Sequence, residues 1–81
     1  MDRALEEIVS ACLIDGRIRE IVQSIANMDE EERERFKKKI HIYFAGRTSD
    51  EDVQAYRFYK IVLERGREIL EEVKKRERGE G

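Results

Sequence analysis

Apolar residues recur along the chain at the spacing of an α-helix, and no segment alternates between apolar and polar residues as a half-buried strand does. We expect a first helix to begin at Asp2 or Arg3, because apolar residues at i, i+3, i+4 and i+7 follow. These residues are Leu5, Ile8, Val9 and Cys12. A second stripe on the same rule consists of Ile14, Ile18, Ile21, Val22 and Ile25. The pattern predicts that the chain is helical from its start to Ile25.

The first apolar stripe ends and the second begins near Asp15-Gly16, and this change of face has two interpretations. At about 100° per residue the second stripe is rotated from the first by roughly a quarter turn or more, so the two do not line up. One long helix bent at Gly16 accounts for this, and so does a chain that turns there and forms two short helices. Glycine costs about 1 kcal/mol in a helix interior relative to alanine. An Asp-Gly pair alone leaves little room for a tight corner, which favours the long helix.

A second helix is predicted over residues 30–45. Asp29 stands where a capping side chain is expected, and Glu32 completes a capping box with it. Acidic residues follow directly and lysines come later, which is the order that the helix dipole favours. The apolar stripe of this helix is short and consists of Phe36, Ile40, Tyr43 and Phe44. Gly46 is well placed as the left-handed residue that ends the helix.

The last and longest helix is predicted to begin after Ser49, a good capping residue, with three acidic residues in its first turn. Its seam positions alternate in steps of four and three, as in a coiled coil. They are Ala55, Tyr59, Val62, Gly66, Ile69 and Val73. After Lys74 the sequence holds only charged residues and glycine, so we expect a charged flexible tail over residues 75–81. The expected domain therefore spans residues 1–74.

Together these elements predict an all-α fold. It is a small antiparallel three-helix bundle, with the first helix kinked or split at Asp15-Gly16. A chain of 81 residues makes one small domain with a thin core, because it buries only about 60% of the surface of its unfolded form. Cys12 is the only cysteine, which excludes an internal disulfide and a cysteine-rich metal site. Domains of this size often gain stability from an oligomer partner.

Charge patterning and composition narrow the class of protein. Charged residues make up 44% of the chain, yet the net charge is only −2, and the two signs interleave as on exposed helices with many ion pairs. This composition is typical of proteins from heat-loving organisms. No apolar run approaches the roughly 18 residues of a membrane span, and the first residues lack the basic and then apolar order of a signal peptide. We therefore expect a soluble cytoplasmic protein with no membrane segment.

The residues that would carry catalysis have simpler structural explanations. Cys12 lies in an apolar stripe, where a small core residue is expected, whereas a nucleophile needs a base and an accessible, electropositive site. His41, the only histidine, is expected at the solvent edge of its helix, and one histidine without clustered carboxylates does not make a metal site. The runs of acid lie at predicted helix starts, where they stabilise the dipole. We expect no enzyme, no cofactor and no metal.

The first helix has more apolar surface than a small bundle needs. Its apolar arc is far wider than the roughly 100° stripe of a surface helix, and the surplus falls at Leu5, Val9 and Leu13. An exposed apolar patch marks an interaction site, and a two-fold pairing of first helices would cover it. The expected partner interface consists of Leu5, Val9, Cys12, Leu13 and Gly66. A protein–protein interaction module is predicted, either a homodimer or a small accessory subunit of a larger assembly.

Gly66 belongs to this set because it interrupts the seam of the longest helix, where alanine would be about 1 kcal/mol better for the helix itself. A glycine at such a position usually admits a close neighbour. That neighbour lies either within the chain, with Tyr43 and Ile18 as the expected contacts, or on a partner helix that crosses there.

The alternative is a nucleic-acid-associated accessory protein of an RNA-modification or replication machinery. Lys37, Lys38, His41 and Arg47 form a local basic cluster that would contact the nucleic acid. Nucleic-acid binding needs an excess of positive charge on one face. The lysines, however, point in different directions around their helix, and acids intervene elsewhere. The alternative therefore ranks second.

Overall fold

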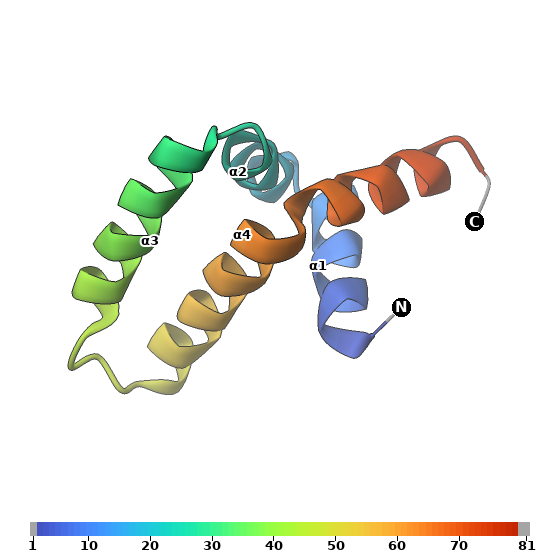
Figure 1. The fold of residues 1–81 in the computed structure, drawn as a ribbon. Coiled ribbons are helices and arrows are strands. Elements are labelled where there is room, and N and C mark those ends of the chain that lie inside the picture. Colours follow the sequence, from blue (N-terminus) through green and yellow to red (C-terminus); the bar gives the residue numbers. More distant parts are fainter. Residues whose placement is uncertain (1, 80–81) are drawn as a thin grey trace.

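Helices account for nearly all of the chain. The computed structural model describes residues 2–79, and within this range there are four helices and no strand. They are α1 (Arg3–Ile14), α2 (Gly16–Ala26), α3 (Glu30–Phe44) and α4 (Asp50–Glu77), arranged as Figure 1 shows. The predicted all-helical fold is confirmed, whereas the predicted number of three helices is wrong.

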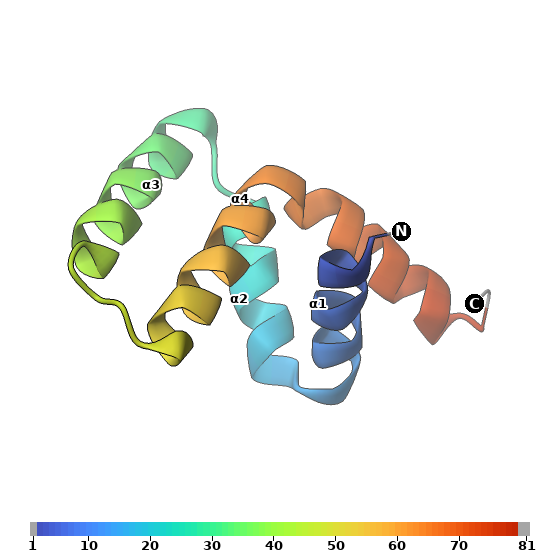
Figure 2. The same cartoon turned by 90° about the horizontal axis from the view of Figure 1, so that it is seen from below.

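The additional helix arises at Asp15, where the chain turns. Asp15 has an extended backbone, with φ −124° and ψ 111°, and it caps both the end of α1 and the start of α2. Its backbone N–H donates to the Ala11 carbonyl (2.8 Å), and its carboxylate accepts from the Arg17 N–H (2.9 Å). Because one residue serves both helix ends, the corner needs no longer loop. The favoured single long helix is wrong and the split is confirmed: α1 and α2 lie side by side (Figure 2).

The other helix boundaries follow the capping residues that the sequence predicts. Asp29 accepts a hydrogen bond from the Glu32 N–H (2.8 Å), and the Glu32 carboxylate accepts from the Asp29 N–H (3.5 Å), so the capping box is confirmed. Gly46 has the expected positive φ of 79°. Ser49 caps α4 by accepting from the Asp52 N–H (3.1 Å).

Each of the other three helices packs on α4. Because the chain turns at Asp15, the apolar stripes of α1 and α2 both face the same core. The largest fully buried side chains come from α1, α2 and α4, and they are Leu5, Val9, Cys12, Val22, Val62 and Ile69. By contrast, α3 packs principally on the first half of α4, where Ile40 is its buried residue. In Figure 2 the first half of α4 therefore lies between α3 and the pair α1 and α2.

Together, α3 and the first half of α4 form an antiparallel pair at one end of the molecule (Figure 1), which we call the α3–α4 hairpin (residues 30–64). Edge-to-face and tilted aromatic contacts join its two helices, with 5.8 Å between the ring centroids of Phe36 and Tyr59 and 5.4 Å between those of Phe44 and Tyr56. The radius of gyration is 13.1 Å, whereas a globular chain of this length has about 12 Å. The hairpin thus makes the molecule elongated.

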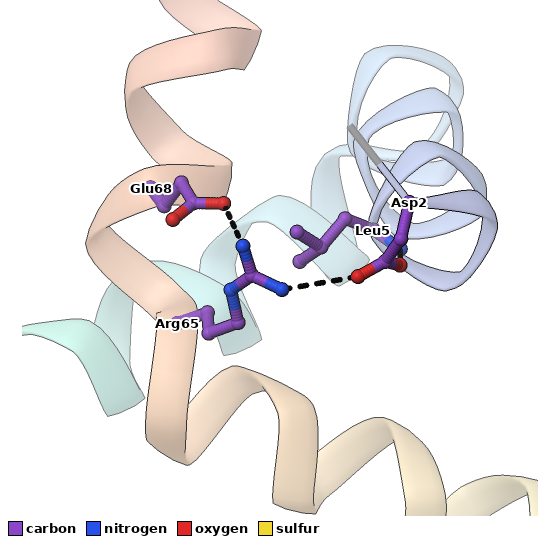
Figure 3. Close-up of polar contacts among 4 residues, drawn as sticks. All are labelled: Asp2, Leu5, Arg65 and Glu68. Atoms are coloured by element: carbon purple, nitrogen blue, oxygen red, sulfur yellow. Dashed lines mark hydrogen bonds and ion pairs between the residues drawn. The ribbon is translucent and has the colours of Figure 1, made fainter.

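The last helix, for which the sequence predicts one continuous coiled-coil-like seam, bends at Arg65. Arg65 has non-helical dihedral angles, φ −132° and ψ 25°. Its guanidinium donates to the carboxylates of Asp2 (3.0 Å) and Glu68 (2.6 Å), so it links the start of α1 to the second half of α4 (Figure 3). Directly after the bend, Gly66 lies against α2, where an added Cβ would be 3.1 Å from the Ala26 Cβ. The bend therefore coincides with a close approach of α4 to α2.

The end of α4 lies beyond Lys74, where the sequence predicts the helix to stop. Helical structure continues to Glu77. Arg76 donates to the carboxylate of Glu6 on α1 (2.8 Å), and Glu77 forms an ion pair with Arg19 on α2. Part of the predicted tail is therefore helical and contacts the core helices. Residues 80–81 of that tail lie outside the described residues.

We predict that Gly66→Leu lowers the free energy of unfolding by about 1–3 kcal/mol, because the added side chain overpacks the contact with Ala26. Urea denaturation measures this. Gly16→Leu is the matched control, since an added Cβ there has no atom within 4 Å. The control is expected to leave stability unchanged or slightly raised. Equal midpoints for wild type and Gly66→Leu would show that α2 and α4 do not meet at this glycine.

A second prediction concerns acid and Asp2. The hydrogen bond from the Leu5 N–H, together with Arg65, lowers the pKa of Asp2 from its ordinary value of 3.8. This carboxylate therefore stabilises the fold above pH ~4, and the contribution is lost as the pH falls through the lowered pKa. Asp2→Asn keeps a capping oxygen but cannot titrate. The stability difference between wild type and Asp2→Asn should shrink below pH ~4. A constant difference down to pH ~2 would contradict the lowered pKa.

Candidate functional site

The α3–α4 hairpin carries a groove of about 430 Å³ between its two helices, which we call the α3–α4 groove. Its lining consists of Glu34, Lys37, Lys38, Ile40, His41, Ile42, Tyr56, Lys60, Leu63 and Glu64. Ile40 and Leu63 are buried and form an apolar floor, one from each helix. Ile42 stands at the rim with 74% of its surface exposed. The groove therefore combines an apolar floor with a charged rim.

The rim lysines differ in their surroundings. Lys37 on α3 forms an ion pair with Glu34 at 3.7 Å. Lys60 on α4 lies over the ring of Tyr56, with 5.6 Å between Nζ and the ring centroid. Among the described residues, no carboxylate lies within 4.0 Å of Lys38 or Lys60. Each wall of the groove thus presents one lysine that forms no ion pair, although a glutamate on the same helix also lines the groove.

A smaller hollow of about 160 Å³ continues the groove toward the loop between α3 and α4. The two share His41 and Tyr56, whose Nδ1 and hydroxyl oxygen are 3.4 Å apart. Arg47 lines the smaller hollow. Its guanidinium lies 4.3 Å from the Tyr43 ring centroid, and its Nε donates to the Tyr43 carbonyl (2.9 Å). His41 therefore shares the groove lining with Lys60 and the hollow lining with Arg47, two cations that lie over tyrosine rings.

The structure brings the predicted nucleic-acid residues together. Lys37, Lys38 and His41 line the α3–α4 groove, and Arg47 lines the adjoining hollow. The same linings contain Glu34, Glu64 and Asp52. Positive charge therefore gathers on this side of α3, but acids are interspersed with it.

The predicted partner interface on the first helix requires a correction. Leu5 and Val9 were expected as an exposed surplus, yet they are 1% and 0% exposed within the single chain, and Cys12 is buried beside them. The turn at Asp15 explains this, because it lets both α2 and α4 cover α1. Leu13 alone keeps a partly open position, at 38% exposure. Ile14 and Ile21 are exposed near the same corner.

Gly66 is also buried within the chain. A neighbour within the chain was one of its two expected explanations, and the neighbour is Ala26 of α2 rather than Tyr43 or Ile18. The five predicted interface residues therefore do not form one surface: four are core positions and only Leu13 is partly exposed.

Seven lining residues are absent from the predicted site, and they are Glu34, Ile40, Ile42, Tyr56, Lys60, Leu63 and Glu64. Two signals were present in the sequence. Ile42 is an apolar residue off the stripe of its helix, and Tyr56 and Lys60 stand four residues apart, as neighbours on one helix face do. What the sequence lacks is the register that sets this face of α4 opposite Lys38 and His41 of α3.

Other features of the described residues bear on chemistry. Burial raises the pKa of the Cys12 thiol, although Arg19 acts in the opposite direction, so the reactive thiolate is disfavoured. Within residues 2–79, no three His, Cys, Asp or Glu side chains are grouped so that they could hold a metal ion. No helix in this range is long and apolar enough to span a membrane.

Comparisons with known proteins do not assign the chain to a family. No protein-family model matches it, and neither a search of curated proteins nor a search of solved structures gave a significant match.

The burial of the groove residues gives a prediction that separates floor from rim. Ile40→Ala should lower the free energy of unfolding by about 2–5 kcal/mol, because it leaves a cavity between α3 and α4. Ile42→Ser should change it by less than about 0.5 kcal/mol, since that side chain is exposed. Chemical denaturation of both variants measures this. Similar losses for both would contradict the placement of Ile42 on the surface.

Proposed function

We propose that the chain is a non-catalytic protein–protein interaction module and that the α3–α4 hairpin is its contact surface. It would act as an accessory subunit of a larger assembly or as a homodimer. The observation that carries the proposal is the exposure of Ile42, Tyr43 and Val53 on a hairpin that also holds an apolar-floored groove. Exposed apolar surface rimmed by charged residues marks sites where proteins bind.

The surface area of the chain supports the proposal. It exposes 6082 Å², whereas a compact monomer of its 9.7 kDa exposes about 5,100 Å². The excess of about 1,000 Å² is comparable with the ~800 Å² that each partner contributes to a standard interface. The α3–α4 hairpin contributes to this additional surface, since α3 packs principally on one helix.

The groove lining fits binding better than catalysis. Its titratable groups are lysines, glutamates, Tyr56 and His41, and among the described residues the hydrogen-bond partner of His41 is the hydroxyl of Tyr56. Cys12, the only thiol of the chain, is buried in the core. A nucleophile beside a general base is the arrangement that covalent catalysis needs. The groove instead offers an apolar floor and charged side chains at its rim, some of which form ion pairs and some of which do not.

Nucleic-acid binding is the second candidate, and one observation favours it. Lys37, Lys38, Lys60 and His41 share one groove with the ring of Tyr56. Glutamates stand in the same lining, however, and the phosphate backbone favours surfaces with a clear excess of positive charge. Protein binding therefore ranks first.

Site-specific photo-crosslinking in native extract tests the proposed function. A photoreactive residue replaces Ile42 or Val53 on the hairpin, Ile14 at the α1–α2 corner, or Glu20 on α2 as a control. We expect both hairpin positions to give the same protein adduct and Glu20 to give none. Reconstitution with the purified partner should then show that Ile42→Lys weakens the complex at least tenfold, about 1.4 kcal/mol. Adducts from Ile14 alone, or none from the hairpin, would contradict the proposal.

A further inference from the structure

We infer that the α3–α4 groove binds an amphipathic helix of a partner protein, and that this helix carries acidic residues on both sides of its apolar stripe. The inference rests on the proposed function and adds the chemical nature of the partner. It follows from the length of the groove, its apolar floor and the arrangement of charge on its two walls.

The groove has the length of a short helical stripe. Its lining runs from Glu34 to Ile42 on α3 and from Tyr56 to Glu64 on α4. At 1.5 Å per residue each wall is about 12 Å long, and apolar residues at i, i+4 and i+7 of a bound helix span about 10.5 Å. Within residues 2–79 there is no strand, so a partner has no sheet edge to extend. Polyproline segments dock on aromatic-lined grooves, whereas Tyr56 is the one aromatic residue of this lining, so a helix lying in the groove is the better-fitting mode.

The floor and the rim suit the two faces of such a helix. Ile40 and Leu63 give the floor, and the exposed Ile42 widens the apolar surface at the rim. A small molecule would need convergent polar groups that fix its orientation. Here the charged side chains are at the rim, where they meet the flanks of a helix and not a ligand on the floor.

The charge on the walls selects an acidic partner. Lys38 on α3 and Lys60 on α4 stand on opposite walls, and neither forms an ion pair among the described residues. The glutamates four residues away on the same helices, Glu34 and Glu64, also line the groove, and its three lysines outnumber these two acids. Lys37 is already paired with Glu34. A helix with glutamates on both flanks would place a carboxylate near each unpaired lysine. Complementary rim charges of this kind decide which partner binds.

The other side of α3 gives no such selection. A second hollow shares Ile40 and Ile42 with the groove, and its charged lining residues are Lys39 and Asp52. One lysine and one aspartate balance each other, so this side favours neither sign of charge.

A second copy of this chain is a poor occupant of the groove. In a two-fold pairing, the same patch of each copy meets the other. Lys37 and Lys38 lie in the middle of the α3 wall and Lys60 in the middle of the α4 wall, so the lysines of the two copies would meet near the axis. In addition, the apolar stripes of α1, α2 and α4 are buried in the core, so none remains to fill the groove. The occupant is therefore a different protein.

Binding of designed peptides to the full chain tests the inference. The probe is a fluorescent, capped peptide of about 16 residues, long enough to form a helix, with leucines at i, i+4, i+7 and i+11 and glutamates on both flanks. A matched peptide has lysine in place of every glutamate. Fluorescence anisotropy at low salt should show that the acidic peptide binds at least tenfold more tightly than the basic one. Ile42→Ser should weaken both.

Charge reversal in the protein locates the effect. Lys38→Glu with Lys60→Glu should reverse the preference, so that the basic peptide binds more tightly. Lys39→Glu with Lys74→Glu is the control, because neither of these lysines lines the groove. That double variant has the same net charge and should keep the preference for the acidic peptide. Circular dichroism establishes that both double variants remain folded.

The outcomes separate this inference from the proposed function. Equal binding of the two peptides, or loss of preference in the control variant, would overturn the acidic helix but leave the hairpin as a contact surface. No peptide binding, with photo-crosslinks still formed at Ile42, would have the same meaning. No peptide binding and no crosslink would overturn both proposals. Binding of a single-stranded oligonucleotide, abolished by Lys38→Glu with Lys60→Glu, would assign the groove to nucleic acid instead.

Discussion

The close crossing of α2 and α4 at Ala26 and Gly66 is the constraint on which the other features depend. A Cβ at Gly66 would lie 3.1 Å from that of Ala26, so a side chain at this position would require the two helices to shift by a few tenths of an ångström. Directly before it, Arg65 departs from helical geometry and binds the cap of α1 through Asp2. The second half of α4 can therefore lie along α1, while the first half leaves the crossing in another direction and receives α3. Gly66 and the bend at Arg65 thus allow the second half of α4 to pack in the core while its first half also forms the hairpin with α3.

The candidate site follows from this division. The first half of α4 has the core helices on one side and α3 on the other. Since α3 packs principally on one helix, most of its circumference stays in water, and exposed apolar residues such as Ile42 have no cover within the chain. The aromatic contacts of Phe36 and Phe44 with the tyrosines of α4 hold the hairpin together without closing the groove. A small domain with a thin core has thus kept apolar surface outside that core, which is the feature that a binding module needs.

The sequence predicts the local features of this fold well and the distant ones poorly. Capping side chains such as Asp29 and Ser49 act within one turn of their own position, and they mark the helix starts correctly. The sequence favours one long helix at Asp15 because an Asp-Gly pair fits both a bend within a helix and a turn between two helices. The turn is possible because one extended residue caps both helix ends. The exposure predicted for Leu5 and Val9 is wrong for the same reason. Without the turn, α2 would not pack on α1, and these two side chains would lack cover. For the site, Lys37, Lys38 and His41 were visible as a cluster, whereas Lys60 and Tyr56 required the register of α4 against α3.

The central claim is that a partner contacts the α3–α4 groove and not the exposed corner between α1 and α2. Amide chemical shifts of the isotopically labelled protein, recorded during titration with an acidic amphipathic peptide, test it residue by residue. The account predicts that the largest shifts fall along residues 34–42 and 56–64, on the two walls of the groove, while Leu13, Ile14 and Ile21 stay unchanged. Shifts concentrated at that corner, or spread evenly over the surface, would contradict the account.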